Sequence, residues 1–252
     1  MIFTQNLKGF YMKKLCLFVL ISTILVGCGG GGGNDDNNSS GGGDTDKATP
    51  LDLGNLTSDV KKQYAQVNYD TFLVITESAL NCAKDLNIGD TDNACAVIDS
   101  GNHNEGLSIE EISGTLSVQK QADKIQISTV KDIQFHAPLI NQNTNTFKLN
   151  QNNIANTQKE TNFIKIPEAT DQEANTQEVE SDQVYLGGTF TFSNDNGIKT
   201  VDAFAHEFYG LIYSHNTNTD ESHFVSSMSR LVGKNNAMVD WSTDENGAIR
   251  PI

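Results

Sequence analysis

The sequence predicts a mainly β protein, an antiparallel sheet or barrel rich in hairpins, with a short helical N-terminal region and a disordered glycine-rich tether. Apolar and polar residues alternate over 112–137 and again over 184–192, which is the period of half-buried strands. Apolar residues recur at helical spacing over 60–67 and 79–86. The stretch 29–46 is too polar and too rich in glycine to bury a core.

The first segment, 1–27, has the features of a secretory signal peptide. Lys13 and Lys14 precede an apolar run of 13 residues, 15–27, which is the charged-then-apolar order of such signals. A membrane-spanning helix needs about 20 apolar residues, so a cleaved signal is favoured over a permanent span. Residues 1–11 have no signal-like character, and we take Met12 as the true start.

Cys28 ends the apolar run and is followed by five glycines. The stretch Leu25-Val26-Gly27-Cys28 resembles the lipobox of bacterial lipoproteins, in which a small residue precedes the modified cysteine. The resemblance implies that the Cys28 thiol receives a diacylglycerol, that cleavage follows Gly27, and that Cys28 becomes an acylated N-terminus carrying palmitate or a similar chain. Two or more acyl chains anchor a protein stably to a membrane. The alternative is a plain signal peptide with a chance cysteine.

Residues 28–50 are predicted to be a lipidated tether. Gly29, and not an aspartate, follows Cys28, so the resemblance favours the cell outer membrane over retention at the inner one. The 18 residues 29–46 behave as a random coil whose ends lie on the order of 23 Å apart. The body is therefore expected to be held near the membrane but free to reorient.

Residues 51–106 are predicted to be a helical region pinned by a disulfide. Either Thr57 or Ser58 can cap the helix. Residues 69–76, between the two helical stretches, are aromatic and β-branched and hence strand-like. We therefore predict a helix that is either continuous or broken in its middle.

The cysteine count predicts one disulfide, between Cys82 and Cys95. Cys16 leaves with the signal and Cys28 is lipidated, so only this pair remains in the exported chain. A single cysteine pair in an oxidising compartment is most simply a disulfide. The rival reading, a metal or redox pair, does not fit the twelve intervening residues.

Residues 107–166 are predicted to form an antiparallel β region. Ile112, Leu116 and Val118 alternate with polar residues, and Ile125 and Ile127 do so after a short connection, which predicts a hairpin. The alternation over 133–137 predicts a third strand or an extension of the second. Short strands are expected at 147–149 and 163–166.

Residues 167–183 are predicted to be an acidic linker or loop, because they hold many acids and almost no large apolar residue.

Residues 184–252 are predicted to be the C-terminal β region. Its first hairpin turns at Asn196-Gly197, since such turns need positive φ. Another strand is expected at 208–213, a short helix or strand at 226–233, and a turn at 244–247.

Charge excludes one class of partner. Three of the 17 Lys and Arg residues lie in 1–27, whereas all 32 Asp and Glu residues follow, so the remainder carries a net charge of about −18. Binding to nucleic acid draws its affinity from basic contacts to phosphates. No nucleic-acid partner is expected.

Two groups of residues invite a metal interpretation. His206, His215 and His223 lie close together in the sequence, but Gly210 stands where an HExxH motif would place its second ligand. If 204–215 were one strand, the first two histidines would face opposite sides. The oxygen-rich stretches 85–93 and 99–102 depart from the EF-hand pattern. We assign no metal ligand and no cofactor.

The sequence lacks two features of nucleophilic catalysis. It contains no GxSxG motif and, with the pairing above, no cysteine free to act as a thiolate. The many exposed acids make any single carboxylate pair uninformative. We assign no catalytic residue and expect no enzyme.

A lipobox followed at once by five glycines and a polar tether resembles the surface lipoproteins exported by Slam-type translocators, such as heparin-binding antigen, factor H binding protein and transferrin-binding protein B. The resemblance implies a C-terminal eight-stranded antiparallel barrel that presents an N-terminal part to host ligands. Residues 188–192, 199–201 and 208–210 are similar to fragments of such a barrel. Because 184–252 is short for eight strands, the barrel would recruit strands from 107 onward or be incomplete.

Together these features predict a surface-exposed outer-membrane lipoprotein that acts as a non-enzymatic binding protein for a host or extracellular ligand. Its partners would be the membrane, through the lipid anchor, and a host protein, because an acidic surface meets basic or metal-bearing proteins or peptides favourably. The alternative is a periplasm-facing structural or accessory lipoprotein that binds an envelope component.

Overall fold

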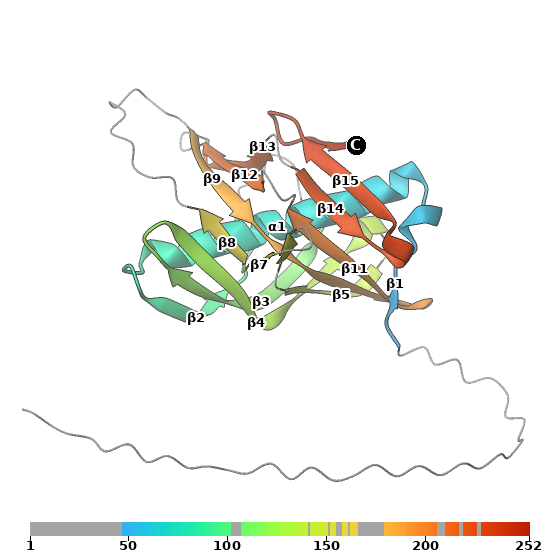
Figure 1. Cartoon of the computed structure of the whole chain (residues 1–252), viewed down its shortest axis with the longest axis horizontal. Helices are drawn as coiled ribbons and strands as arrows, with labels where there is room; N and C mark the ends of the chain where they lie inside the picture. The colour runs from blue at the N-terminus through green and yellow to red at the C-terminus, as the bar shows by residue number, and fades with distance from the viewer. Residues whose placement is uncertain are drawn as a thin grey trace, which may run out of the picture. The chain divides into compact units, whose positions relative to one another are not determined.

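In the residues that the structure describes, one α-helix packs against a large antiparallel sheet (Figure 1). The structure is a computed structural model and describes residues 47–101, 107–140, 142–150, 152–154, 158–160, 162–165, 179–205, 210–216, 219–225 and 228–252. The predicted mainly β class, with its antiparallel sheet and its helix, is confirmed. The predicted signal peptide, Cys28 and the tether up to residue 46 lie outside the described residues.

Within the described residues the main sheet has 14 strands. In chain order they are β1 (Thr49–Pro50), β2 (Thr91–Ala96), β3 (Glu110–Lys120), β4 (Lys124–Ala137), β5 (Gln142–Leu149), β8 (Asn162–Lys165), β9 (Val179–Tyr185), β10 (Gly187–Asn194), β11 (Gly197–Ala205), β12 (Leu211–Asn216), β13 (Glu221–Val225), β14 (Met228–Val232), β15 (Met238–Thr243) and β16 (Ile249–Pro251). A separate pair is formed by β6 (Asn152–Ile154) and β7 (Gln158–Glu160). Short 3-10 turns span Leu53–Asn55, Pro138–Ile140 and Lys234–Asn236.

Strand β4 joins two branches of the sheet. One of its edges pairs with β3, while the other edge is shared between β8 near its start and β5 near its end. From β8 the order continues through β9 and β12 to β13, and from β5 through β10, β11, β14 and β15 to β16. Because only Leu186 separates β9 from β10, the chain passes directly from one branch to the other. Strands from 107 onward thus join those of 184–252 in one sheet.

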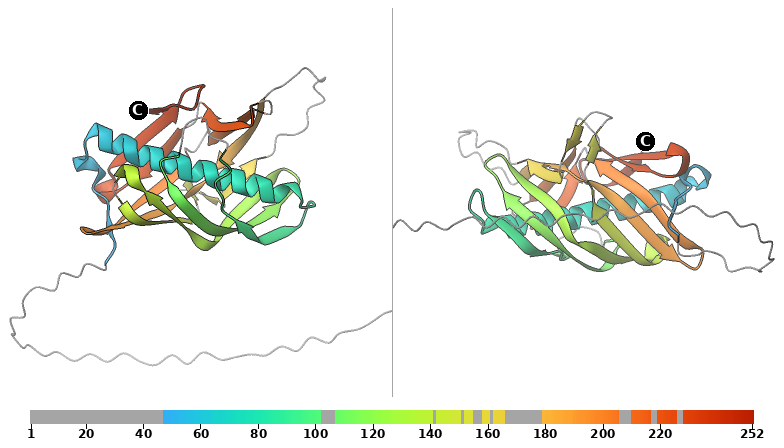
Figure 2. Two further views of the ribbon diagram at one scale, coloured as in Figure 1. Left: turned by 180° about the vertical axis from the view of Figure 1, so that it is seen from behind. Right: turned by 60° about the horizontal axis from the view of Figure 1, so that its bottom comes forward.

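Helix α1 (Ser58–Lys84) crosses this sheet without interruption, as both views in Figure 2 show. It contacts β2, β3 and β4 as well as β15 and β16. Of the two alternatives left open, the broken helix is therefore wrong. All residues of 67–79 are buried, and a helix enclosed on every side is apolar all round instead of along one stripe. The strand-like composition of 69–76 reflects this burial.

The N-cap and two buried threonines of α1 form hydrogen bonds within the helix. Thr57 is the N-cap, and its hydroxyl accepts a hydrogen bond from the Val60 amide at 3.4 Å. The buried hydroxyls of Thr71 and Thr76 donate to the carbonyl oxygens of Val67 and Phe72, at 2.7 and 2.8 Å. A satisfied hydroxyl can be buried at little cost, which is why two threonines are tolerated in the core. In the described part of the chain, no helix combines the length and apolar character needed to cross a membrane.

The hairpins expected from the alternating pattern are present. β3 and β4 form the first, and the apolar residues of 133–137 extend β4 instead of making a new strand. β10 and β11 form the second, with Asn194 opposite Gly197, whose φ is 96°. Residues 228–232 of the segment left as helix or strand form β14. The last turn closes with a bond from the Gly247 amide to the Asp244 carbonyl.

Two predicted segment boundaries are corrected. Residues 179–183, assigned to the acidic linker, belong to β9 and pair with β8 and β12. Acidic side chains do not prevent a strand when neighbours on both sides pair with its backbone. Thr49 and Pro50, assigned to the tether, form β1 beside β11, where burial of Leu51 and Leu53 draws the chain against the sheet.

The region 51–106 is not separate from the β body. β2, which lies in this region, pairs with β3, and Cys95 of β2 is bonded to Cys82 of α1, with the two Cα atoms 5.9 Å apart. The disulfide foreseen from the cysteine count therefore ties the end of the helix to the edge of the sheet.

Reduction of this disulfide is expected to lower the free energy of unfolding by about 3 kcal/mol, because a closed loop of about 14 residues restricts the unfolded chain. Urea unfolding with and without reductant would measure the loss. The double variant Cys82→Ser/Cys95→Ser is the control and should be insensitive to reductant. An unchanged midpoint after complete alkylation of both thiols would contradict this expectation.

Candidate functional site

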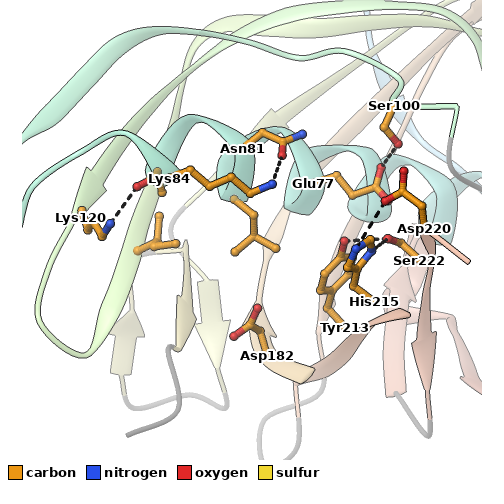
Figure 3. A pocket seen from close by; sticks show the side chains of 13 residues that line it. Glu77, Asn81, Lys84, Ser100, Lys120, Asp182, Tyr213, His215, Asp220 and Ser222 are labelled. Atoms are coloured by element: carbon orange, nitrogen blue, oxygen red, sulfur yellow. Dashed lines mark hydrogen bonds and ion pairs between the residues drawn. The ribbon is translucent and has the colours of Figure 1, made fainter. Parts of the chain in front are cut away.

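A pocket of about 590 Å³ lies where the C-terminal half of α1 faces β4, β9, β12 and β13 (Figure 3). This volume is within the range of about 300–1,000 Å³ that is usual for small-ligand sites. The pocket is lined from several parts of the chain that are remote in sequence. Its walls carry carboxylates, lysines, hydroxyls and apolar side chains.

One wall is a single face of the helix. Glu77, Leu80, Asn81 and Lys84 line the pocket, and their spacing of three, four and seven residues places them on one side of α1. Glu77 is 5% exposed, and its Oε2 accepts a hydrogen bond from the Ser100 hydroxyl at 2.8 Å. The buried core around 67–79 ends at this point, so polar side chains can line the helix here.

The opposite wall is one face of β9, β12 and β13. Asp182 lies directly across from Tyr213, and Ser222 lies directly across from His215. Tyr213 and His215 are two residues apart on β12, so all four side chains project from the same face of the sheet. Leu211, two residues before Tyr213, is fully buried, and the face therefore changes from core to pocket along β12.

A chain of contacts connects the polar groups of this wall. The Tyr213 and Ser222 hydroxyls are 2.8 Å apart, and the Ser222 hydroxyl is 2.9 Å from Nδ1 of His215. Nε2 of His215 lies 3.5 Å from a carboxylate oxygen of Asp220, whose side chain is 70% exposed. The chain thus runs from the buried end of the pocket to its rim, as Figure 3 shows.

Burial raises the pKa of Tyr213 from 10.0 to about 12. The hydrogen bond with Ser222 lowers this pKa, and the negative charges of Glu77, Asp182 and Asp220 raise it further. The three carboxylates therefore act together at one position, and this end of the pocket favours positive charge.

The phenol of Tyr213 should stay protonated until about pH 12 in the folded protein. Because the folded pKa lies above the unfolded value, its contribution to stability is complete below pH 10 and is lost as the pH rises from 10 to 12. Ultraviolet absorbance of tyrosinate, compared between the protein and its Tyr213→Phe variant, would measure the titration. A midpoint near 10 for the Tyr213 signal would contradict the burial argument.

Ser222, His215 and Asp220 contain the residue types of a hydrolase triad, but their arrangement differs from one. Ser222 is 3% exposed, and its hydroxyl is already engaged by both Tyr213 and His215. A nucleophile must reach a substrate carbon while its base takes the proton. This geometry favours a role for Ser222 in orienting His215 and Tyr213.

The other end of the pocket is basic. Lys120, from the end of β3, donates to the Ala83 carbonyl at 3.0 Å, and Lys84 donates to Oδ1 of Asn81 at the same distance. Both ammonium groups lie at the C-terminal end of α1, where the helix dipole favours positive charge. In Figure 3 Lys120 is at the opposite side of the pocket from Glu77 and Asp220, and the Lys84 ammonium reaches back to Asn81 between them.

The three candidate histidines do not lie together in the described structure. His215 lines the pocket, whereas His223, next to Ser222 on β13, alternates to the other face. His206 lies outside the described residues. β11 ends at Ala205 and β12 begins at Leu211, so 204–215 is not a single strand.

The oxygen-rich loops form hydrogen-bonded turns. Carboxylates of Asp90, Asp92 and Asp99 accept bonds from nearby backbone amides. Across the described ranges, no group of three or more His, Cys, Asp or Glu is placed to hold a metal ion.

Sequence reasoning missed most of this site. It singled out His215 but not Glu77, Asp182, Tyr213 or Ser222. One available signal was Glu77 itself, an acid two residues after the apolar run 72–75. The residues that face it are more than 100 positions away, and their proximity depends on the order of the strands.

No protein-family model matches the chain, and comparison with curated proteins and with solved structures also finds no match. The function is therefore inferred from the sequence and from the geometry of the pocket.

Proposed function

We propose that this protein is a lipoprotein, anchored through Cys28 to the outer membrane and exposed at the cell surface, that acts as a non-enzymatic binding protein for an extracellular ligand. The pocket between α1 and β12–β13 is the observation that carries the binding role. The anchor rests on the lipobox-like stretch that ends at Cys28.

The composition of the pocket supports binding. Small-ligand sites combine apolar walls with a few convergent polar groups, and here Leu80 and Ile125 lie among carboxylates, lysines and hydroxyls. Ser222 is buried and its hydroxyl has two hydrogen-bond partners, which favours a binding role over nucleophilic catalysis. The net charge of about −18 that follows residue 27 favours ligands that carry positive charge.

The Cys28→Ser variant is expected to lose all palmitate labelling and to leave the membrane fraction, or to retain its signal. Without the thiol no diacylglycerol can be attached, and anchoring needs the acyl chains. Metabolic labelling followed by membrane fractionation would measure both effects. Cys16→Ser is the matched control, because Cys16 lies in the segment that cleavage removes, and it should label normally. Normal labelling of Cys28→Ser would refute the anchor.

Protease treatment of intact cells distinguishes the surface role from the periplasmic one. An epitope placed in 184–252 should be lost while a periplasmic marker stays intact. Protection of the epitope would instead favour the periplasm-facing accessory lipoprotein, and the ligand would then be sought in the envelope.

A further inference from the structure

Opposite charges lie at the two ends of the pocket. Glu77, Asp182 and Asp220 gather around Tyr213, whereas the Lys120 ammonium lies at the C-terminal end of α1 and that of Lys84 reaches back to Asn81 (Figure 3). In a pocket for a simple cation, the lysines would repel the ligand. A pocket for a simple anion would not place carboxylates beside a buried tyrosine.

The helix sets the distance between the two ends. Glu77 and Lys84 are seven residues apart, which is about two turns, so both lie on one face and about 10 Å apart along the axis. Leu80 and Asn81 lie between them on the same face. The helix wall therefore presents an acid, then an apolar side chain and an amide that holds the Lys84 ammonium, and the Lys120 ammonium lies beyond them at Ala83.

We propose that the pocket binds a short linear peptide through both of its free termini, with the ammonium group at the Glu77 end and the carboxylate at the Lys84 end. This inference rests on the proposed binding function and names its ligand class. An extended chain spans about 3.4 Å per residue, so a separation of about 10 Å corresponds to about three residues.

The acidic end suits an ammonium group. Glu77 is almost fully buried and Asp182 is half-buried, so their charges are less screened by water than those of surface acids. Beside the burial of the phenol, the charges of Glu77, Asp182 and Asp220 raise the pKa of Tyr213, in keeping with a negative potential at this position.

The basic end suits a carboxylate. The ammonium group of Lys120 donates one bond to the Ala83 carbonyl, and a lysine has three such protons to offer. Lys84 is exposed and lines the pocket next to this end, with its ammonium group bonded to Asn81. Between the two ends, Leu80 and Ile125 can contact small apolar side chains, and Asn81 can bond to a peptide group.

Titration calorimetry with the full lipoprotein in detergent tests the proposal with three probes that differ only at their ends. Trialanine should bind. N-acetyl-trialanine lacks the ammonium group and trialanine amide lacks the carboxylate, and each should bind about tenfold or more weakly. Dialanine should also bind more weakly, because it cannot span both ends.

Variants test each end separately. Glu77→Gln should weaken trialanine about tenfold but leave the affinity for N-acetyl-trialanine unchanged. Lys84→Met should also weaken the binding of trialanine about tenfold, and it should leave the affinity for trialanine amide unchanged. Because Glu77 is buried, Asp182→Asn serves as the second variant at the acidic end. Asp59→Asn and Lys62→Met are the controls, since both are exposed on α1 and outside the pocket.

The outcomes separate this inference from the function on which it rests. Equal binding of trialanine and either blocked form would overturn recognition of both termini. If no peptide binds but a free amino acid, sugar, organic acid or diamine raises the melting temperature, and Asp182→Asn removes that rise, the peptide inference fails while the binding function stands. If none of these probes binds, both fail.

Discussion

Gly188→Ala is expected to lower the free energy of unfolding by more than about 3 kcal/mol, or to prevent folding altogether. A Cβ atom at this position would lie 2.2 Å from the carbonyl oxygen of Lys148 and 2.5 Å from the ring of Phe147. Both distances are far shorter than van der Waals contact, so either the backbone or the ring must move.

Neither can move easily. β10 is paired on both sides at Gly188, with Leu149 of β5 and with Ala203 of β11. The Phe147 ring is fully buried, with its centroid 4.4 Å from that of Phe190 and 5.5 Å from that of Phe72 on α1. The strain would therefore spread into the contact between helix and sheet.

Chemical unfolding of Gly188→Ala would be compared with that of Gly54→Ala. At Gly54 the nearest atom to an added Cβ is 3.5 Å away, an ordinary contact, so this control should change stability by less than about 0.5 kcal/mol. Glycine in a strand is entropically costly, so an alanine that fitted would stabilise the protein. A rise in the unfolding midpoint of Gly188→Ala would therefore refute the steric argument.

Asn68→Leu is expected to destabilise the protein by about 2–3 kcal/mol. Asn68 is fully buried in α1, and its Oδ1 accepts hydrogen bonds from Nε1 of Trp241 and from the Ser229 hydroxyl, each at 3.1 Å. Leucine is similar in size but offers no acceptor. The indole N–H of Trp241 would then be buried without a partner, which costs about 1–3 kcal/mol.

A double-mutant cycle with Trp241→Phe isolates this bond. Removing both partners should cost less than the sum of the two single changes, with a coupling of at least about 1 kcal/mol. Ser229 keeps its bond to the Phe204 carbonyl in every variant. Additive losses of stability would show that the Asn68–Trp241 bond contributes nothing beyond packing.

Local features of the fold were predictable because their causes are local. Thr57 caps α1 through its own side chain, and Gly197 has the positive φ that the β10–β11 turn requires. The alternation in β3 and β4 follows from a sheet with one buried face. Such features need only neighbours in sequence.

The helix at 69–76 was not decided by its local sequence. Aromatic and β-branched residues there favour a strand, and they are helical because every face of α1 is buried over 67–79. Tyr69 illustrates this: its ring packs on Phe224 of β13 and Trp241 of β15, with centroids 5.4 and 5.8 Å away. Tertiary packing overrides a weak intrinsic preference.

By itself, the sequence determined the β class, the turns, an N-cap at Thr57 or Ser58, the pairing of Cys82 with Cys95 and the acidic charge of the chain. Only the tertiary structure decided that α1 is continuous, that β9 extends into the acidic segment, and that Glu77 faces Tyr213. The physical reason is the distance along the sequence between the residues that interact. Turns and caps arise from interactions over a few residues, whereas a pocket exists only when the order of the strands brings distant side chains onto facing walls.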